Sequence, residues 1–351
     1  MTAMAKHGHY AGRTEIRWGI LGCGDVTEVK SGPGFQKAAG SRLVAVMRRN
    51  ADLAADYARR HGVARWYNDA AALIADPEVD AVYIATLPGT HAAYALQVAA
   101  AGKPAYVEKP MARTTGECDH MVDAFARANL PLFVAYYRRR LPRFLAVEEI
   151  LQRGLLGVVT GISYRLAAPH HQAASGWRLD AESAGGGHFL DVGSHALDIL
   201  DCWFGPLQQV AGNAANLGSP YAVEDAVTLT FSTPAGVPGA MACNFASAVK
   251  DDCLRISGTL GEVALSVYGN DAVRLETGAG VELLDRPNPP HVAQPLIQTV
   301  VDDLLGRGIC PSTGESGRRT TQVMDQALQS FYGRRDDAFW SRPHTWRQRG
   351  A

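Results

Sequence analysis

The chain has 351 residues, of which 47% are hydrophobic and 20% are charged, and its formal net charge is -1. This length is enough for two domains of ordinary size. The near-neutral charge excludes a broad basic surface for nucleic acid or for an anionic membrane, and no apolar run approaches the roughly 18 residues of a membrane span.

The N-terminal segment has no apolar stretch of the kind that signal peptides carry. We therefore expect residues 1–13 to form a flexible tail. The six cysteines show no C-x-x-C motif and no paired spacing, which argues against a disulfide framework or a structural zinc site. These features predict a cytoplasmic protein.

Short apolar runs alternate with helical segments between residues 14 and 135. Strands are predicted at 16–21, 43–47, 81–85, 105–107 and 132–135. Helices are predicted at 51–61, 70–75, 90–101 and 115–129. Strand and helix in alternation form βαβ units, so residues 14–135 are predicted to be an α/β domain with a doubly wound parallel sheet.

The pattern changes in residues 136–351, where we expect a second, α+β domain. After a helix at 143–153, alternating runs predict strands at 158–167, 226–232, 239–246, 254–258, 263–267 and 272–277. A turn at 234–236 joins two of these runs as a hairpin. The sheet is predicted to be open and mostly antiparallel, and helices at 293–305 and 316–332 end the domain.

A glycine-rich turn, Gly22-Cys23-Gly24, follows the first predicted strand. Such a turn lets a pyrophosphate approach the backbone, and the next helix start supplies amide donors. Thr27 stands where the third glycine of the usual pattern would be, and a purely structural turn is the alternative. We expect the cofactor contacts in this turn to come from Gly22, Cys23, Gly24, Asp25 and Val26.

Two arginines, Arg48 and Arg49, follow the second predicted strand, where an acidic residue would bind a ribose 2′-hydroxyl. Guanidinium groups suit a 2′-phosphate instead. This favours NADP(H) over NAD(H). The alternative is that the arginines cover a solvated edge or stack on adenine.

The triplet Glu108-Lys109-Pro110 follows the fourth predicted strand. The carboxyl ends of parallel strands line the ligand crevice, so Lys109 can lie beside a nicotinamide. Lysine is rare here, with six in the chain, and unlike arginine it can exchange a proton. We expect a cis Lys109–Pro110 bond. The loop after the third strand adds further cofactor candidates, namely Thr86, Leu87, Pro88 and His91, although helix-start packing is the alternative for His91.

A run of three glycines, Gly185 to Gly187, leads into a helical pattern. Asp191, His195 and Asp198 follow at i, i+4 and i+7, and on one helix they share a face. Burying these groups is costly unless they are paired or used. The pattern indicates either a structural His–Asp pair or part of a site.

The glycine turn, the Glu108-Lys109-Pro110 triplet and the glycine run with Asp191 and His195 occur in an order that resembles the Gfo/Idh/MocA oxidoreductase family. This family is named for glucose–fructose oxidoreductase and inositol dehydrogenase, and the resemblance covers about residues 15–330. It implies an N-terminal Rossmann domain and a C-terminal sheet used for substrate and for subunit contact.

The resemblance also implies catalytic roles for Lys109, Asp191 and His195. It places Arg48 where NAD-using members often carry Asp, and Tyr137 where Asn is frequent. The implied reaction transfers a hydride between nicotinamide C4 and a secondary alcohol or ketone of a sugar, a polyol or a sugar derivative. His195 is then the acid/base group, an aspartate orients it, and Lys109 stabilises the reacting oxygen.

Substrate contacts are expected mainly from the catalytic groups and from two loops. The candidates are Lys109, Tyr136, Arg139, His171, Trp177, Arg178, Asp191 and His195, with His188 as a lesser candidate. Loop packing is the alternative for His171 and Trp177.

Three other functions stay open at this point. One is a glycoside hydrolase or lyase of the same fold that uses bound NAD by transient oxidation. The others are a metal-dependent sugar enzyme and a non-catalytic sugar sensor. No metal is expected, and the C-terminal sheet suits a homo-oligomer, either a dimer or a tetramer.

Overall fold

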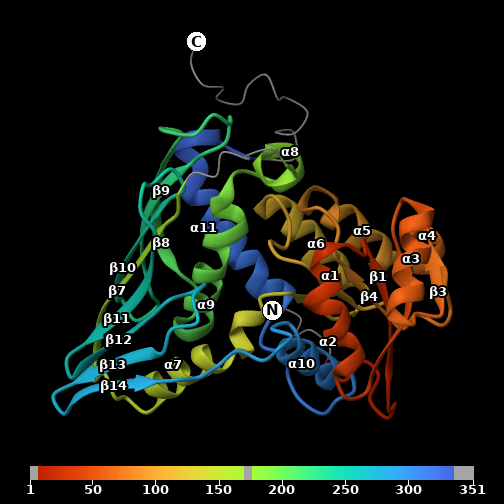
Figure 1. Ribbon diagram of the computed structural model, residues 1–351, viewed down its shortest axis with the longest axis horizontal. Helices are drawn as coiled ribbons and strands as arrows, with labels where there is room; N and C mark the ends of the chain where they lie inside the picture. Colours follow the sequence, from red (N-terminus) through yellow and green to blue (C-terminus); the bar gives the residue numbers. More distant parts are fainter. Residues whose placement is uncertain (1–6, 170–175, 336–351) are drawn as a thin grey trace. The chain divides into compact units, whose positions relative to one another are not determined.

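The computed structural model describes residues 7–169 and 176–335 (Figure 1). The chain forms two compact units. The first contains Met1–Arg139 and Pro289–Arg318, and the second contains Arg140–Asn288 and Arg319–Ala351.

The first unit is built on a parallel sheet. Within the described residues six strands have the order β3-β2-β1-β4-β5-β6, and every pairing is parallel. The strands are β1 (Ile16–Leu21), β2 (Ser41–Met47), β3 (Arg65–Tyr67), β4 (Ala81–Ile84), β5 (Ala105–Val107) and β6 (Leu132–Val134). This confirms the doubly wound parallel sheet. The strand order reverses between β1 and β4, where ligands bind in folds of this kind.

Helices cover both faces of this sheet. They are α1 (Asp25–Val29), α2 (Ser31–Lys37), α3 (Ala51–His61), α4 (Ala70–Ala75), α5 (Pro88–Ala100), α6 (Thr115–Arg127) and α10 (Gln294–Leu304). Two apolar cores result: Ile20 and Tyr83 belong to one, and Val82 and Ile84 belong to the other. Because the strands are buried on both faces, they appear in the sequence as continuous apolar runs.

The division of the chain differs from the expected one at 135/136, because residues 289–318 belong to the first unit. Leu296, Ile297 and Val300 of α10 are fully buried in the first unit's core. A Cβ atom on Gly34 of α2 would lie 2.7 Å from the Ile297 Cδ1 atom, so the two helices pack closely. An amphipathic pattern predicts a helix, but it does not reveal which core that helix joins.

The expected flexible tail is also partly corrected. Over residues 7–13 the chain is held to the first unit, since the Tyr10 hydroxyl donates to the Asp80 carbonyl at 2.8 Å. Arg13 forms an ion pair of 2.7 Å with the Asp80 carboxylate. Residues 1–6 lie outside the described part of the chain.

The second unit contains an open mixed sheet. Within the described residues eight strands have the order β14-β13-β12-β11-β7-β10-β9-β8, and only the β7–β10 pairing is parallel. The strands are β7 (Val159–Ala167), β8 (Gln208–Ala215), β9 (Ala226–Ser232), β10 (Pro238–Asn244), β11 (Asp251–Gly258), β12 (Gly261–Leu265), β13 (Val273–Thr277) and β14 (Gly280–Leu284). The mostly antiparallel sheet and the β9–β10 hairpin are confirmed.

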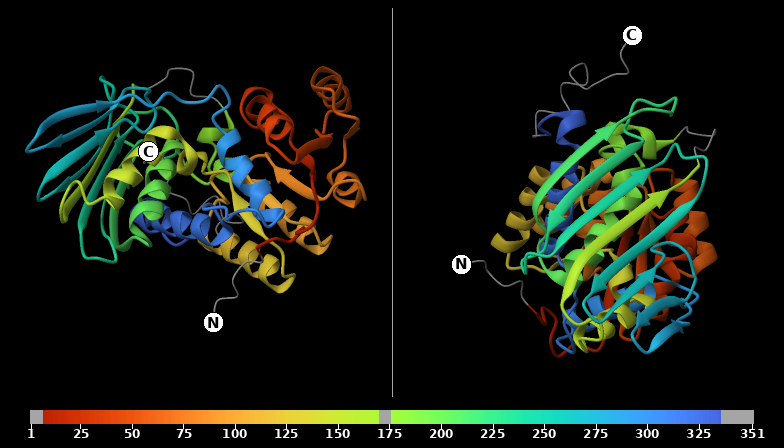
Figure 2. Two further views of the ribbon diagram at one scale, coloured as in Figure 1. Left: turned by 90° about the horizontal axis from the view of Figure 1, so that it is seen from below. Right: turned by 90° about the vertical axis from the view of Figure 1, so that its left-hand side faces the viewer.

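One face of the second sheet is covered by helices of the same unit, while the strands form the opposite face (Figures 1 and 2). The helices are α7 (Pro142–Gln152), α9 (Ser194–Phe204) and the later part of α11 (Gly314–Tyr332), and the short α8 (Ala181–Ala184) belongs to the same unit. The packing on α11 is close, because a Cβ atom on Gly212 of β8 would lie 2.6 Å from the Ala327 Cα atom.

In the described part of the chain, none of the helices has both the length and the apolar character needed to cross a membrane.

Candidate functional site

The glycine-rich turn lies at the carboxyl end of β1. Gly22 has a φ of 87°, which favours glycine, and a Cβ atom there would lie 2.9 Å from the Ala85 carbonyl oxygen. The backbone N–H groups of Gly22 and Cys23 donate to the Met47 carbonyl at 2.9 and 3.0 Å. The turn is therefore fixed between the ends of β1, β2 and β4.

Thr27 replaces the third glycine without disturbing the turn. Its hydroxyl accepts from the Gly24 N–H at 2.9 Å and donates to the Gly24 carbonyl at 2.8 Å. A Cβ atom on Gly24 itself would approach only the Gly22 carbonyl, at 3.9 Å, so the backbone is open to a ligand on that side. This close-approach geometry fits the pyrophosphate of a dinucleotide.

Arg48 and Arg49 follow β2 beside this turn. The Arg48 N–H donates to the Tyr67 carbonyl at 3.1 Å, and neither arginine forms an ion pair with another described residue. Burial raises the pKa of the Cys23 thiol to about 11, and the nearby Arg48 guanidinium opposes that rise. Positive charge therefore lies next to the turn, at the place where a ribose would be held.

Lys109 follows β5 and is half-buried, with a cis bond to Pro110 as expected. Its backbone N–H donates to the Glu108 carboxylate at 3.0 Å. The Glu108 carboxylate also accepts from the Tyr83 hydroxyl, and burial raises the pKa of this carboxyl. The backbone before Lys109 is thus fixed to β4 and β5.

His91 lies between the loop that follows β4, which contains Thr86, and the loop that follows β5, which contains Lys109 and Pro110. Its Nδ1 atom lies 3.1 Å from the Pro110 carbonyl, and its Nε2 atom lies 3.1 Å from the Thr86 carbonyl. The side chain is fully buried, and burial lowers its pKa to about 4. The neutral ring has one N–H and can donate to only one of these two carbonyls. Its buried place between the two loops favours the packing alternative over a direct cofactor contact.

The neighbouring candidates lie on the same loop. Thr86 is next to the glycine turn, because its Cγ2 atom would be 2.8 Å from a Cβ on Gly22. Leu87 and Pro88 begin α5. The turn, the Thr86 loop and Lys109 therefore follow β1, β4 and β5, at the carboxyl ends of neighbouring parallel strands.

The helix of the second unit that carries Asp191 and His195 differs from the expected single α-helix. Phe189–Gly193 form a π-helical turn, and α9 begins only at Ser194. His195 and Asp198 are buried, whereas Asp191 is half-buried and accepts from the Arg178 Nε at 3.1 Å. Because a π-helical turn holds more residues than an α-helical turn, Asp191, His195 and Asp198 do not have the regular α-helical spacing that was expected to place them on one face. Turns of this type are frequent at functional sites.

A cavity of about 940 Å³ lies in the second unit beside these residues. Its lining includes Arg178, His188, Tyr221, Phe245, Lys250 and Tyr268. Arg178 is the partner of Asp191, and the Tyr268 ring lies edge-on to the His195 ring with 6.0 Å between centroids. Asp191 and His195 are not themselves among the lining residues, but each contacts a side chain that is.

Sequence reasoning missed Tyr221, Phe245, Lys250 and Tyr268. They come from strand ends and loops that are far apart in the chain, and no short motif connects them. Lys250 carried the one usable signal, since it is the only lysine after Lys109.

The remaining substrate candidates are less favoured. Tyr136 is fully buried in the first unit's core, and Arg139 is buried with its Nη1 atom donating to the Pro311 carbonyl at 2.7 Å. Both side chains are buried within the first unit, and their contact with substrate stays a prediction. Trp177 is half-buried under the Arg178 guanidinium, 4.5 Å from the ring centroid, and His171 lies outside the described residues.

Among residues 7–169 and 176–335, no three His, Cys, Asp or Glu side chains lie close enough together to hold a metal ion.

A doubly wound sheet with a glycine-rich turn after its first strand, joined to a second unit with its own cavity, is an architecture typical of dinucleotide-binding enzymes. Family models agree with this class. Residues 16–136 match the model described as oxidoreductase family, NAD-binding Rossmann fold, and residues 144–264 match the GFO/IDH/MocA C-terminal domain. The chain belongs to the GFO/IDH/MocA family of oxidoreductases.

Individual relatives are consistent with the family. Oxidoreductase P35 of Formosa agariphila is 36% identical over 318 residues, which are 89% of this chain and 98% of that protein. The 1,5-anhydro-D-fructose reductase of Ensifer adhaerens is 27% identical over 86% of this chain and 92% of its own length. A levoglucosan dehydrogenase in complex with NADH shares the fold, with a TM-score of 0.82 at 21% identity over 90% of this chain and 96% of that one. These names favour oxidoreduction over the hydrolase or lyase alternative.

Proposed function

We propose that this oxidoreductase transfers a hydride between nicotinamide C4 and a secondary alcohol or ketone of a sugar, a polyol or a sugar derivative. The observation that carries the proposal is the cavity of the second unit, which has aromatic and charged groups on its walls, including Arg178, the partner of Asp191, and Tyr268, which contacts His195. Such a lining suits a hydroxylated ring. The names of two relatives, a 1,5-anhydro-D-fructose reductase and a D-apiose dehydrogenase, support the same substrate class.

In the proposed mechanism the dinucleotide, when bound, accepts or supplies the hydride. His195 takes the hydroxyl proton of the substrate during oxidation and returns it during reduction. Asp191 or Asp198 orients the ring and supports its charged form. Lys109 donates a hydrogen bond to the reacting oxygen and stabilises the charge that develops there.

The proposal is tested by a screen of sugars, polyols and their keto forms with each of NAD(H) and NADP(H), followed at the nicotinamide absorbance. We expect sustained turnover of at least one cyclic sugar or sugar derivative. Product formation without any steady change in nicotinamide absorbance would contradict net oxidoreduction and would revive the transient-oxidation alternative.

The proposed cofactor preference is for NADP(H), and Arg48 carries it. An Arg48→Asp variant loses a charge-assisted hydrogen bond to the 2′-phosphate and gains a carboxylate that suits a free 2′-hydroxyl. We expect the ratio of kcat/KM with NADP to that with NAD to fall about 10- to 100-fold. Parallel initial-rate measurements with both cofactors give this ratio.

Arg42→Asp is the matched control, because Arg42 lies at the start of β2, at the opposite end of the strand from Arg48, and pairs with Glu15 at 2.8 Å. Its ratio should equal that of the wild type. A wild-type preference for NAD, or an unchanged ratio in Arg48→Asp, would contradict the assignment.

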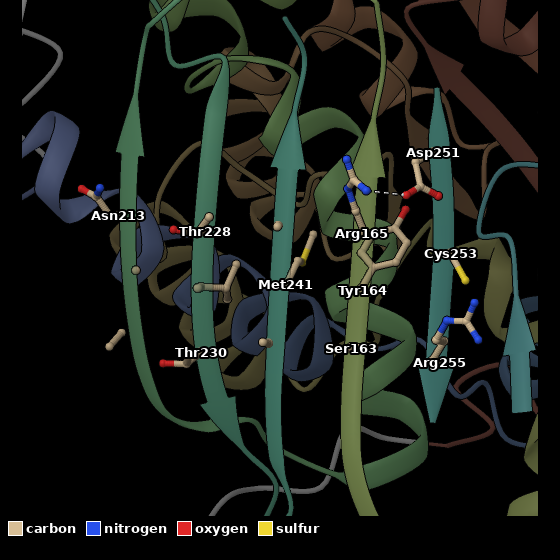
Figure 3. Close-up of a pocket in the computed structure, with 15 residues that line it drawn as sticks. Ser163, Tyr164, Arg165, Asn213, Thr228, Thr230, Met241, Asp251, Cys253 and Arg255 are labelled. Atoms are coloured by element: carbon tan, nitrogen blue, oxygen red, sulfur yellow. Dashed lines mark ion pairs between the residues drawn. The ribbon is translucent and has the colours of Figure 1, made fainter. Parts of the chain in front are cut away.

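The proposed oligomer is a dimer or a tetramer formed through the second sheet. On the face opposite the helices a hollow of about 730 Å³ is lined mainly by small side chains, including Ser163, Thr228, Ala240 and Ala242 (Figure 3). Solvated sheet faces usually carry polar side chains, whereas small ones allow a second flat surface to approach closely. Arg165 and Asp251 form an ion pair of 3.2 Å at the side of this hollow (Figure 3).

An Ala242→Glu variant is expected to separate the subunits. Ala242 pairs with Thr228 and with Arg165 in the neighbouring strands, and a two-fold interface would bury the new carboxylate in both copies. Light scattering should give the mass of one 37.6 kDa chain for the variant and a multiple of it for the wild type. The control Ala279→Glu, in the exposed turn after β13, should keep the wild-type mass. A monomeric wild type would rule out the proposed interface.

We also propose a cytoplasmic location, which is supported by the absence of a disulfide between any of the cysteines, all of which lie in the described residues.

A further inference from the structure

Two adjacent carboxylates, Glu224 and Asp225, have no exposed surface and lie just before β9. Burying two charges side by side is costly unless hydrogen bonds compensate for the lost water. Their hydrogen-bond partners belong to the glycine run before His188, to the loop before Tyr221, to Phe245 and to α11. Their partners therefore indicate what the pair does.

Glu224 holds the glycine run. The Gly187 N–H lies 2.9 Å from both carboxylate oxygens, and the Tyr332 hydroxyl donates to the same carboxylate at 2.7 Å. A Cβ atom on Gly187 would lie 2.5 Å from the Glu224 carbonyl oxygen, whereas one on Gly186 would lie 2.2 Å from the Leu190 Cδ1 atom and 3.3 Å from a Glu224 carboxylate oxygen. Gly187 is therefore needed because Glu224 lies against the backbone of the bend.

The other side of the bend is held from the C-terminal end of the chain. The Arg335 Nη1 atom donates to the Gly185 carbonyl, and its guanidinium pairs with Asp325 of α11. The backbone that leads to His188 is consequently fixed at both Gly185 and Gly187.

Asp225 binds the backbone near the two other aromatic residues of the cavity, Tyr221 and Phe245. Its carboxylate accepts from the N–H groups of Leu217, Gly218 and Ser219 at 2.9, 2.8 and 2.8 Å, which orders the loop before Tyr221. Its carbonyl accepts from the Phe245 N–H at 2.7 Å.

The three residues that this pair supports meet in the cavity. The His188 ring lies 5.5 Å from the Phe245 ring and 6.3 Å from the Tyr221 ring, measured between centroids. All three line the cavity, and we call them the aromatic wall. Aromatic rings bind well to the apolar C–H face of a ring whose hydroxyls point outward.

We propose that Glu224 is a positioning residue for substrate binding: it fixes the aromatic wall, and the wall binds the apolar face of a cyclic, hydroxylated substrate. This inference rests on the proposed function, and it assigns a subsite to the ring of the substrate. Asp225 fixes the same wall from its other side. None of these residues belongs to the glycine turn of the first unit, and we expect the effect to fall on substrate binding.

The test is a double-mutant cycle on KM for the best sugar found in the substrate screen. Glu224→Gln keeps one oxygen that can accept from the Gly187 N–H, but it replaces the other by an NH₂ donor, so the bond that Gly187 shares between two oxygens and the bond from the Tyr332 hydroxyl cannot both be kept as they are. We expect KM for the sugar to rise about tenfold, with the KM for the cofactor unchanged. His188→Ala is expected to raise KM for the sugar by a similar factor.

The double variant separates positioning from independent effects. If Glu224 acts through the wall, Glu224→Gln adds less than about twofold in the His188→Ala background. Additive effects, with KM near a hundred times the wild-type value, would overturn the proposal. An unchanged KM in Glu224→Gln, accompanied only by a lower melting temperature, would also overturn it, because that is the result of a purely structural role.

Two further variants keep the result interpretable. Ile256→Val removes one methyl group from the buried sheet core and should lower the melting temperature without changing KM. Tyr332→Phe removes only one hydrogen bond from the Glu224 carboxylate and replaces Glu224→Gln if that variant does not fold. Alone, Tyr332→Phe should raise KM for the sugar about threefold, but added to His188→Ala it should cause no further rise.

Failure of the inference is distinguishable from failure of the proposed function. Wild-type turnover of a sugar establishes the function whatever the variants do. Calorimetric titration of the sugar into each variant measures wall binding without any turnover.

Discussion

Replacing Lys109 by methionine is expected to lower kcat about 100- to 1,000-fold, because the variant loses the donor that stabilises charge on the reacting oxygen. Methionine preserves most of the side-chain volume, so the fold of the loop should be retained. The Lys109 backbone is fixed independently by Glu108, and the Pro110 carbonyl is bound by His91. Initial rates at saturating cofactor and sugar measure the effect.

Lys109→Arg should fail as well, since a planar guanidinium does not replace a compact ammonium donor. The matched control is Lys103→Met. Lys103 lies in the same unit and donates to the Asp76 carbonyl at 2.7 Å, away from the carboxyl ends of the strands. It should retain wild-type kcat within about twofold. A Lys109→Met enzyme with similar retention would remove Lys109 from the mechanism.

The second large effect is expected for His195→Asn, which keeps a polar side chain of similar reach but cannot act as an acid or a base. General acid–base catalysis contributes roughly 10² to 10⁴ in rate, and kcat should fall by about that factor. Cofactor affinity, measured by nicotinamide fluorescence, should stay at the wild-type value because the glycine turn and Arg48 belong to the first unit.

His120→Asn is the control for this substitution, since His120 is exposed on α6 of the first unit. Its kcat should match the wild type. A His195→Asn enzyme that retains more than about a third of wild-type kcat would show that another group moves the proton.

The parallel sheet followed directly from the sequence because its strands are buried on both faces. Runs such as Ala81–Ile84 are continuously apolar, and each is followed by a helical segment with a glycine or proline stop. β3 was missed because Arg65–Tyr67 is short and none of its residues is fully buried. β8 was missed for a related reason: its side chains are polar or small, and burial alternates only weakly along it.

The return of residues 289–318 to the first unit was not predictable from local pattern. An apolar stripe such as Leu296, Ile297 and Val300 establishes that a helix has a buried face. Which core receives that face depends on contacts between distant segments, here with Gly34 of α2. Local periodicity contains no information about such contacts.

The residues of the candidate site also fall into those that the sequence predicts and those that only the structure brings together. The glycine turn, Lys109 and His195 belong to contiguous motifs, so their residue types and spacing were sufficient to find them. The π-helical turn at Phe189–Gly193 was not predicted, because helical spacing looks the same in the sequence whether or not one turn is widened. The cavity residues, such as Tyr221 and Phe245, meet only through the tertiary fold, and the buried Glu224 that supports them has no local sequence signal.

The central claim is that Lys109 and His195 act on one substrate oxygen, and a crystal structure of the enzyme with bound NADP⁺ and a sugar that it turns over tests this most directly. We expect the Lys109 Nζ atom and a His195 ring nitrogen each to lie within about 3.5 Å of the same hydroxyl oxygen. A complex in which either group lies more than about 8 Å from that oxygen, with no water between them, would contradict the proposed mechanism.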